Sequence, residues 1–163
     1  MDNIIPNVAN GGEEEKVEWE PRKMLGTLQG GAIVESGVKI SAHTNRVAVS
    51  DGHLVCLSVE LGKRAGIEEI KAALRAYQAA GASRDLPSAP HPVILVDDRD
   101  DRPQPRLDRM VGGGMATVVG RVRPDPLFDV KMAVLSHNTV RGAAGGSIYN
   151  AELLVSVGLV SPG

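Results

Sequence analysis

Two valine-rich stretches flank a proline-rich turn and predict an antiparallel hairpin. Residues 116–123 and 130–136 have the composition of β-strands, and the Pro-Asp-Pro segment at 124–126 favours a turn between them. No helix separates the two stretches, whereas parallel neighbours need a crossover connection of a dozen or more residues. This part of the chain therefore does not have the pattern of a βαβ unit.

The remaining elements point to the same fold class. Residues 38–44 alternate apolar and polar side chains, residues 53–61 place His53, Val55, Leu57, Val59 and Leu61 on one face, and the Asp51-Gly52 pair between the two stretches predicts a second hairpin. A short buried strand is expected at residues 93–96, and helices are expected at residues 13–26, 67–80 and 138–157. We therefore predict one α+β domain over residues 1–163, with an antiparallel or mixed β-sheet that carries helices on one face.

Composition excludes several classes of function. The net charge of −2 offers no electrostatic footprint for nucleic acid or an anionic membrane, and no apolar run approaches the length of a membrane span. The four histidines lack metal-ligand spacing, so no metal site is expected. Cys56 is the only cysteine, which indicates a reducing compartment, and the first residues do not resemble a signal peptide. A cytoplasmic protein is expected, with Cys56 as a buried structural thiol.

Arg46 and His53 flank the Asp51-Gly52 turn and are candidates for chemistry. A guanidinium is a permanent cation that suits a carboxylate, and a histidine can act as an acid or a base near neutral pH. The alternative, which residue types alone favour, is an exposed arginine and a histidine at a turn edge. In an ideal hairpin the two would lie roughly 13 Å apart along the strands. Joint action on one small substrate therefore requires a bend or bulge between Arg46 and Asp51.

Glu20 and Lys23 lie three residues apart on the first predicted helix, and this spacing places them on one face. A solvated ion pair, worth a few tenths of a kcal/mol, is the simpler explanation of the spacing. Spacing alone favours this explanation.

Several short motifs follow one another in a recognisable order. They are Asn3-Ile4-Ile5-Pro6, then Glu20-Pro21-Arg22-Lys23-Met24-Leu25, Arg46 with His53, Gly120-Arg121-Val122-Arg123 with Asp125, His137-Asn138 with Arg141-Gly142-Ala143-Ala144, and Asn150-Ala151-Glu152-Leu153. Together they resemble the motifs of aspartate-semialdehyde dehydrogenases, in family order and over nearly the whole chain. The variants at residues 20–23 and 142–146 resemble those of the fungal branch.

The resemblance implies an NADPH-dependent oxidoreductase. In that family L-aspartyl 4-phosphate is reductively dephosphorylated to aspartate semialdehyde, on the route to lysine, threonine, methionine and isoleucine. The family's Rossmann domain and its Asn-Cys nucleophile motif have no match in this sequence. The resemblance is therefore to the C-terminal catalytic and dimerisation part, which has the fold of the C-terminal domain of glyceraldehyde-3-phosphate dehydrogenase-like proteins. NADP is expected in the intact enzyme, with none bound to this chain alone.

The resemblance also implies a role for each candidate residue. His53 would be the general acid/base, Arg46 would bind the substrate α-carboxylate, Glu20 its ammonium group, and Lys23 the phosphoryl group or phosphate. Asn150 would contact the nicotinamide side of the cofactor. The glutamine that usually closes this last motif is not matched by Glu152-Leu153.

Partners follow from the same resemblance. The family's subunits pair through the sheet of this domain, so a homodimer is expected. The C-terminal helix, residues 138–160, would pack on the cofactor domain. Its apolar face, made by Ile148, Ala151, Leu154 and Val155, is expected to be exposed, docked on its own sheet or swapped between chains. The alternative functions are a dimerisation module without catalysis and a stand-alone module that binds an acidic metabolite.

Overall fold

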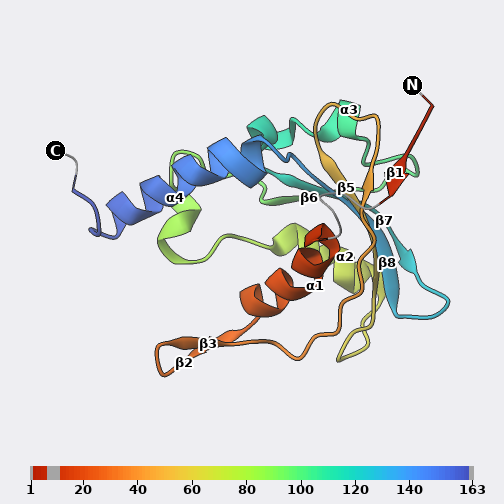
Figure 1. Ribbon diagram of the computed structural model, residues 1–163, viewed down its shortest axis with the longest axis horizontal. Helices are drawn as coiled ribbons and strands as arrows, with labels where there is room; N and C mark the ends of the chain where they lie inside the picture. The colour runs from red at the N-terminus through yellow and green to blue at the C-terminus, as the bar shows by residue number, and fades with distance from the viewer. Residues whose placement is uncertain (1, 7–11, 162–163) are drawn as a thin grey trace. The chain divides into compact units, whose positions relative to one another are not determined.

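A computed structural model of the chain describes residues 2–6 and 12–161 (Figure 1). The chain forms two compact units, Met1–Ala48 and Val49–Gly163. The second unit contains a mixed four-stranded sheet with helices, which confirms the predicted α+β class. None of the helices in the described part of the chain is long and apolar enough to cross a membrane.

The first unit consists of one helix and two small antiparallel ladders. In one ladder β1 (Ile5–Pro6) pairs with β4 (Asn45–Arg46). After α1 (Gly12–Met24), β2 (Thr27–Gln29) and β3 (Ala32–Val34) form the other. The turn of this hairpin is Gly30-Gly31, with φ of +58° and +82°, and glycine adopts such values without steric cost.

The strand predicted over residues 38–44 is wrong. This segment runs without regular structure, because carboxylates of α1 take backbone amides that a neighbouring strand would otherwise bind. Glu18 Oε1 accepts from the amide of Ala42 at 2.8 Å, and Glu14 Oε1 accepts from that of Thr44 at 2.7 Å. Alternation of side chains cannot reveal this, since the partners lie on a helix some 24 to 30 residues earlier.

The second unit is built on a sheet with strand order β5-β8-β7-β6. The strands are β5 (His53–Val59), β6 (Ile94–Asp97), β7 (Thr117–Pro124) and β8 (Val130–Ser136). The predicted hairpin of residues 116–136 is confirmed as β7–β8, with a register shift between Gly120 and Arg123. The strand predicted at residues 93–96 is β6, and its parallel pairing with β7 makes the sheet mixed.

The hairpin predicted around Asp51-Gly52 is wrong. Its second strand exists as β5, but β5 pairs with β8 and places His53 opposite Ser136. Arg46, on the other side of the turn, lies in β4 and faces Ile5 of β1. The spacing of roughly 13 Å expected for an ideal hairpin therefore has no structural basis.

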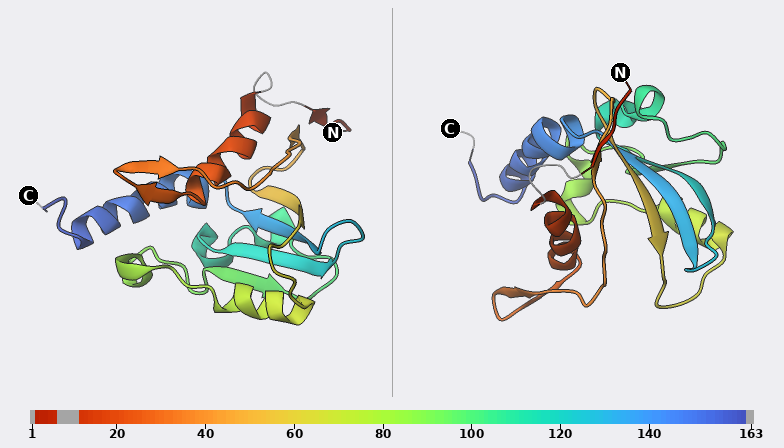
Figure 2. Two further views of the ribbon diagram at one scale, coloured as in Figure 1. Left: turned by 90° about the horizontal axis from the view of Figure 1, so that it is seen from below. Right: turned by 45° about the vertical axis from the view of Figure 1, so that its right-hand side comes forward.

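Helix α2 (Ile67–Ala76) covers part of this sheet. Ile67, Ile70 and Leu74 pack against the core cluster of Val96, Val119, Val122 and Val130, and Figure 2 shows α2 beside β6. The helix ends four residues before the predicted Ala80. At Tyr77 the backbone becomes extended and its amide donates to the Leu74 carbonyl, so Tyr77 is exposed and does not join the apolar face.

Short helical segments connect the remaining strands. They are a 3-10 helix at Gly81–Asp85, α3 (Pro105–Asp108), a 3-10 helix at Val111–Gly114, a π-helix at Val140–Ala144 and α4 (Gly145–Ser156). The last two confirm the predicted C-terminal helix. Segment 99–109 contains the single turn α3.

Cys56 is exposed, so the expectation of a buried thiol is wrong. The physical reason is the position of its strand. β5 lies at the edge of the sheet, and every one of its residues except Val59 is exposed. The residue pattern correctly predicted a strand here. It did not reveal that, in the described part of the chain, both faces of β5 are left uncovered.

An ion pair at the end of β6 makes the stability of the fold depend on pH in the acid range. Hydrogen bonds from the Arg99 guanidinium hold the pKa of the Asp97 carboxyl at about 2, below its usual 3.8. A depressed folded-state pKa stabilises the fold above pH 3.8, and the contribution is lost as the pH falls toward 2. Relative to Asp97→Asn, the wild-type chain should be about 1 kcal/mol more stable at pH 6 in urea unfolding. We expect this difference to shrink by pH 2.5; a constant difference would contradict the assignment.

Candidate active site

His53 is the first residue of β5, and its side chain is exposed. The preceding Gly52 has φ of +107°, which a residue with a side chain adopts only with strain. A Cβ at Gly52 would also lie 3.2 Å from Cδ1 of the fully buried Leu135. The chain therefore enters β5 through a turn that glycine permits, and this turn presents an imidazole to solvent at the end of the sheet.

Arg46 lies in the first unit and His53 in the second. Arg46 is exposed at the end of β4. The β1–β4 ladder places it opposite Ile5, the third residue of the Asn-Ile-Ile-Pro motif. Two motifs separated by about forty residues in the sequence thus meet in one ladder.

Glu20 and Lys23 line one cavity of the first unit, with a volume of about 580 Å³. The cavity lies between α1 and the β2–β3 hairpin, and its walls are Trp19, Glu20, Lys23, Met24, Gly26, Leu28 and Ile33. A Cβ at Gly26 would lie only 2.4 Å from the carbonyl oxygen of Val34, so glycine is needed for this close approach. The predicted shared face of Glu20 and Lys23 is confirmed as a feature of α1, and an open cavity lies beside it.

Trp19 is a residue of this cavity that sequence reasoning missed. Lys23 Nζ lies 5.8 Å from the centroid of the indole ring, within the range of a cation–π interaction. The indole Nε1 donates to Glu35 Oε1 at 2.8 Å, which fixes the ring. The spacing of four residues between Trp19 and Lys23 was the available signal, since such residues are neighbours on a helix.

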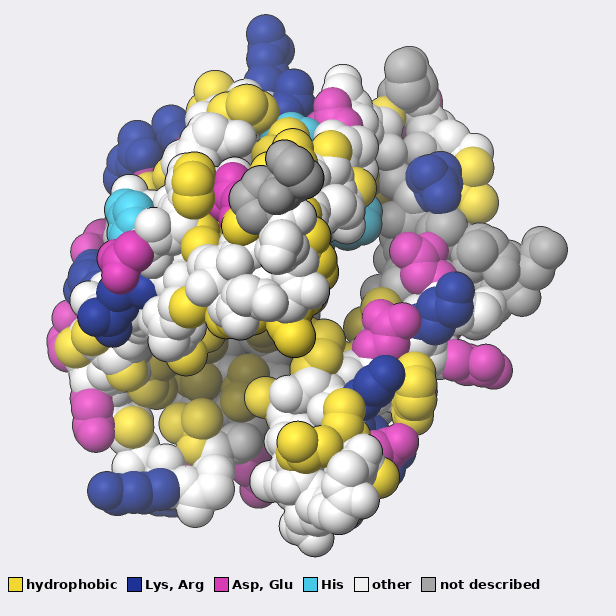
Figure 3. Space-filling model, turned by 90° about the vertical axis from the view of Figure 1, so that its left-hand side faces the viewer, with side chains coloured by type: hydrophobic (Ala, Val, Ile, Leu, Met, Phe, Trp, Pro, Cys, Tyr) yellow, Lys and Arg dark blue, Asp and Glu magenta, His cyan; other side chains and the backbone are white. Residues whose placement is uncertain are grey.

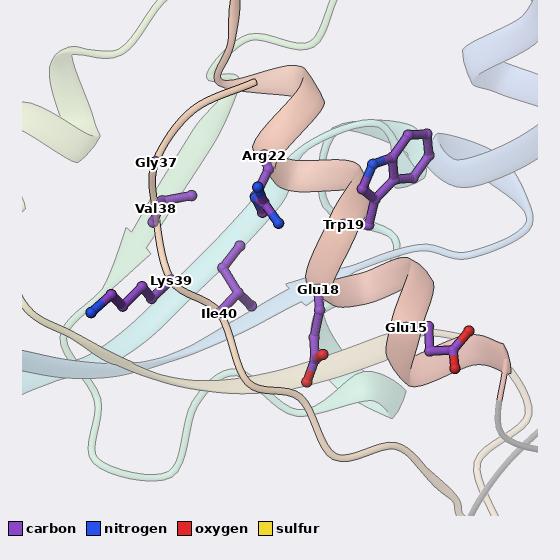
Figure 4. Close-up of a pocket in the computed structure, with 8 residues that line it drawn as sticks. All are labelled: Glu15, Glu18, Trp19, Arg22, Gly37, Val38, Lys39 and Ile40. Atoms are coloured by element: carbon purple, nitrogen blue, oxygen red, sulfur yellow. The ribbon is translucent and has the colours of Figure 1, made fainter. Parts of the chain in front are cut away.

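A second cavity, of about 480 Å³, lies on another side of α1 (Figure 4). Figure 4 shows Glu18 and Arg22 pointing from the helix toward the segment of Val38 and Ile40. Both side chains already have partners, because Glu18 binds the Ala42 amide and Arg22 lies 3.0 Å from Glu35. Glu18 therefore binds the segment that follows β3 to α1, and neither side chain is free to bind a ligand in this cavity.

Asn150 is exposed on α4. Neighbouring residues attach this helix to the loop of residues 81–88: Tyr149 Oη donates to the Ser83 carbonyl, and Glu152 accepts from both the amide and the hydroxyl of Ser88. Ile148, Leu154 and Val155 are exposed, which is one of the three arrangements expected for the apolar face of this helix. Figure 3 shows hydrophobic side chains exposed among charged ones on the face that it draws.

Within residues 2–6 and 12–161, no group of three or more histidine, cysteine, aspartate or glutamate side chains is arranged to hold a metal ion.

A family profile described as "Semialdehyde dehydrogenase, dimerisation domain" matches residues 1–141 of this chain. This chain belongs to that family. The semialdehyde dehydrogenase dimerisation domain described above is 49% identical over 154 residues to the aspartate-semialdehyde dehydrogenase of Archaeoglobus fulgidus, covering 94% of the chain and 43% of the relative. It is 45% identical over 167 residues to that of Candida albicans, covering 98% of the chain and 45% of the relative.

Solved structures show the same likeness. The crystal structure of the Candida albicans enzyme with NADP superposes with a TM-score of 0.88 at 44% identity, covering 98% of this chain and 46% of that one. The structure of aspartate semialdehyde dehydrogenase II of Vibrio cholerae, complexed with ASA, superposes with a TM-score of 0.72 at 27% identity. The match covers 94% of this chain and 41% of that one. The domain thus spans less than half of these relatives and corresponds to their C-terminal part. The resemblance drawn from the motifs is confirmed, and it extends to archaeal as well as fungal enzymes.

Proposed function

We propose that this chain is the substrate-binding and dimerisation part of an NADPH-dependent aspartate-semialdehyde dehydrogenase. The reaction would convert L-aspartyl 4-phosphate to aspartate semialdehyde and phosphate, in the cytoplasm. The nucleophilic cysteine and the cofactor domain would be supplied outside the sequence described here. On its own, the chain is expected to be inactive.

One observation carries this proposal: Glu20 and Lys23 share a cavity of about 580 Å³. The substrate bears an ammonium group and a phosphoryl group, so a carboxylate and an ammonium side chain match both of its charges. Glu20 would receive the substrate ammonium, and Lys23 would face the phosphoryl group or phosphate. An ion pair of surface residues would explain the spacing on α1 but not the cavity that these two side chains line together with the β2–β3 hairpin.

The family resemblance also supplies proposed roles for His53 and Arg46. The exposed imidazole of His53 would act as general acid/base, taking a proton from the attacking thiol and returning one to the substrate oxygen. The exposed guanidinium of Arg46 would bind the substrate α-carboxylate through two parallel hydrogen bonds.

Asn150 is the proposed contact of this chain with the cofactor. NADPH would supply the hydride when bound. Asn150 fits the nicotinamide side, because its exposed carboxamide can both donate and accept hydrogen bonds, as the amide of the nicotinamide ring can. The exposed apolar face of α4 would pack on the cofactor domain, as the family resemblance implies.

A homodimer through the sheet is the proposed assembly. β5 is an edge strand, and Leu54, Val55 and Leu57 expose apolar side chains on both of its faces. An uncovered edge of this kind favours association. Light scattering at micromolar concentration should give twice the mass of the 163-residue chain. A strictly monomeric chain would contradict this assembly.

Calorimetry separates the enzyme-part proposal from a stand-alone binding module. We expect an aspartate analogue to show no tight binding to the chain alone. Activity should appear in what we call the joined protein, in which this chain follows the amino-terminal part of the Candida albicans relative. Tight binding to the chain alone would favour the acidic-metabolite module. A folded joined protein without activity would favour a dimerisation module.

Lys23 provides a test of the assigned roles. In the reverse direction, with aspartate semialdehyde, phosphate and NADP, Lys23→Met in the joined protein should raise the KM for phosphate about 10- to 100-fold, because a charged hydrogen bond is lost. The KM for the aldehyde should change far less. Lys16→Met is the matched control, since Lys16 lies on α1 but does not line the cavity. An equal effect of both substitutions would refute the role of Lys23.

A further inference from the structure

We propose that Asn138 is a positioning residue for His53. The inference rests on the proposed role of His53 as acid/base, and it concerns how the chain holds that side chain in place. The key contact is a 2.8 Å hydrogen bond in which the amide of Gly52, the residue before His53, donates to Asn138 Oδ1. The two residues are 86 positions apart in the sequence.

The peptide unit between Asp51 and Gly52 is held at both of its polar atoms. Its N–H donates to Asn138, and its carbonyl oxygen accepts from Arg109 Nη1 at 3.4 Å. The side chains of Leu135, Pro105 and Arg109 also lie close to Gly52, since a Cβ added there would be 3.2 to 3.7 Å from them. Because the orientation of this peptide sets the direction in which the next residue leaves, the restraint passes directly to His53.

The β-ladder does not supply this restraint, which is why a side chain is required. Hydrogen-bonded pairing of β5 with β8 ends at His53 opposite Ser136. One step further, His137 would face Gly52, but its carbonyl oxygen accepts from the amide of Gly142 at 3.0 Å, and its side chain is buried. Asn138 thus takes a donor that β8 no longer binds.

Asn138 lies between two elements of regular structure. It follows β8, whose Leu135 is fully buried, and it precedes the π-helix at Val140–Ala144. An acceptor between a core strand and a helix can keep a fixed position, and through Gly52 it can fix that of His53 at the exposed end of the sheet. Positioning of an acid/base within about 1 Å matters, since such misplacement can cost about 10²-fold in rate.

Amide hydrogen exchange of the chain tests the contact, and kinetics of the joined protein tests its consequence. In Asn138→Ala we expect the Gly52 amide to exchange about tenfold faster or more, because its acceptor is gone. In the joined protein, kcat should fall about 10²-fold while the KM for aspartate semialdehyde changes less than about threefold. Asn138→Asp keeps an acceptor oxygen and should restore both Gly52 protection and most of kcat.

Two further variants serve as a control and as a substitute for Asn138→Ala. Thr139→Val is the matched control, because Thr139 Oγ1 lies 3.4 Å from the Asp51 carboxylate but does not bind the 51–52 peptide; protection of Gly52 and kcat should both be retained. If Asn138→Ala does not fold, as judged by the amides of β7 and β8, Asn138→Ser removes the contact with a side chain too short to reach.

The outcomes separate this inference from the role of His53. Unchanged Gly52 exchange in a folded Asn138→Ala variant, or lost protection with unchanged kcat, would overturn the positioning role. If His53→Gln leaves the joined protein fully active while Asn138→Ala still exposes Gly52, the assignment of His53 fails and the restraint on Gly52 stands. Loss of kcat in both variants, with rescue by Asn138→Asp, is the result we expect.

Discussion

Replacing His53 by glutamine in the joined protein is expected to lower kcat about 10²- to 10⁴-fold, the range that general acid/base catalysis contributes. The KM for aspartate semialdehyde should change less than about threefold, because the proposed substrate contacts are made by Glu20, Lys23 and Arg46. Glutamine retains hydrogen-bonding atoms of similar reach but cannot transfer a proton near neutral pH.

The matched control is His91→Gln, at an exposed histidine of the same unit that has no role in the proposed site. This variant should keep the wild-type kcat, so a general effect of losing a histidine is excluded. If the joined protein with His53→Gln keeps more than about a tenth of its activity, His53 is not the acid/base.

The largest expected effect on stability is at Asp108. This carboxylate is buried, forms an ion pair with the largely buried Arg102, and accepts from the backbone amide of Gln104 at 2.6 Å. Asp108→Ala leaves the guanidinium of Arg102 with only the exposed Asp101, whose carboxylate lies 3.9 Å from Nε. The free energy of unfolding should fall by about 3 kcal/mol, since breaking a buried pair leaves a poorly compensated charge.

A double-mutant cycle in urea unfolding tests this explanation. The variant that combines Asp108→Leu with Arg102→Met lacks both charges. Its loss of unfolding free energy should be smaller than the sum of the losses in Asp108→Leu alone and Arg102→Met alone. Asp108→Asn keeps an acceptor for the Gln104 amide but removes the charge, so we expect an intermediate loss. Strict additivity of the two single changes would show that the pair does not act as a unit.

Local patterns were sufficient for those elements whose partners are close in the sequence. The β7–β8 hairpin was predictable because the Pro-Asp-Pro turn joins two neighbouring strands. The shared face of Glu20 and Lys23 followed from helical spacing. The C-terminal helix was found at nearly its observed place, although its π-helical first turn was not foreseen.

Distant partners account for the errors. Residues 38–44 alternate like a strand, but Glu14 and Glu18 of α1 bind their amides. Asp51-Gly52 has the composition of a hairpin turn, yet Asn138 and Arg109 hold it, and β5 pairs with β8. Cys56 lies on a strand whose place at the sheet edge is decided by this pairing. The cavity beside Lys23 likewise required the unforeseen β2–β3 hairpin.

The most direct test of the central proposal is the rate of NADP reduction by the joined protein with aspartate semialdehyde and phosphate. We expect activity that requires all three reactants, is absent from this chain alone, and is lost in the His53→Gln variant. A joined protein that is folded and dimeric but does not reduce NADP under these conditions would contradict the proposal, as would turnover by this chain alone.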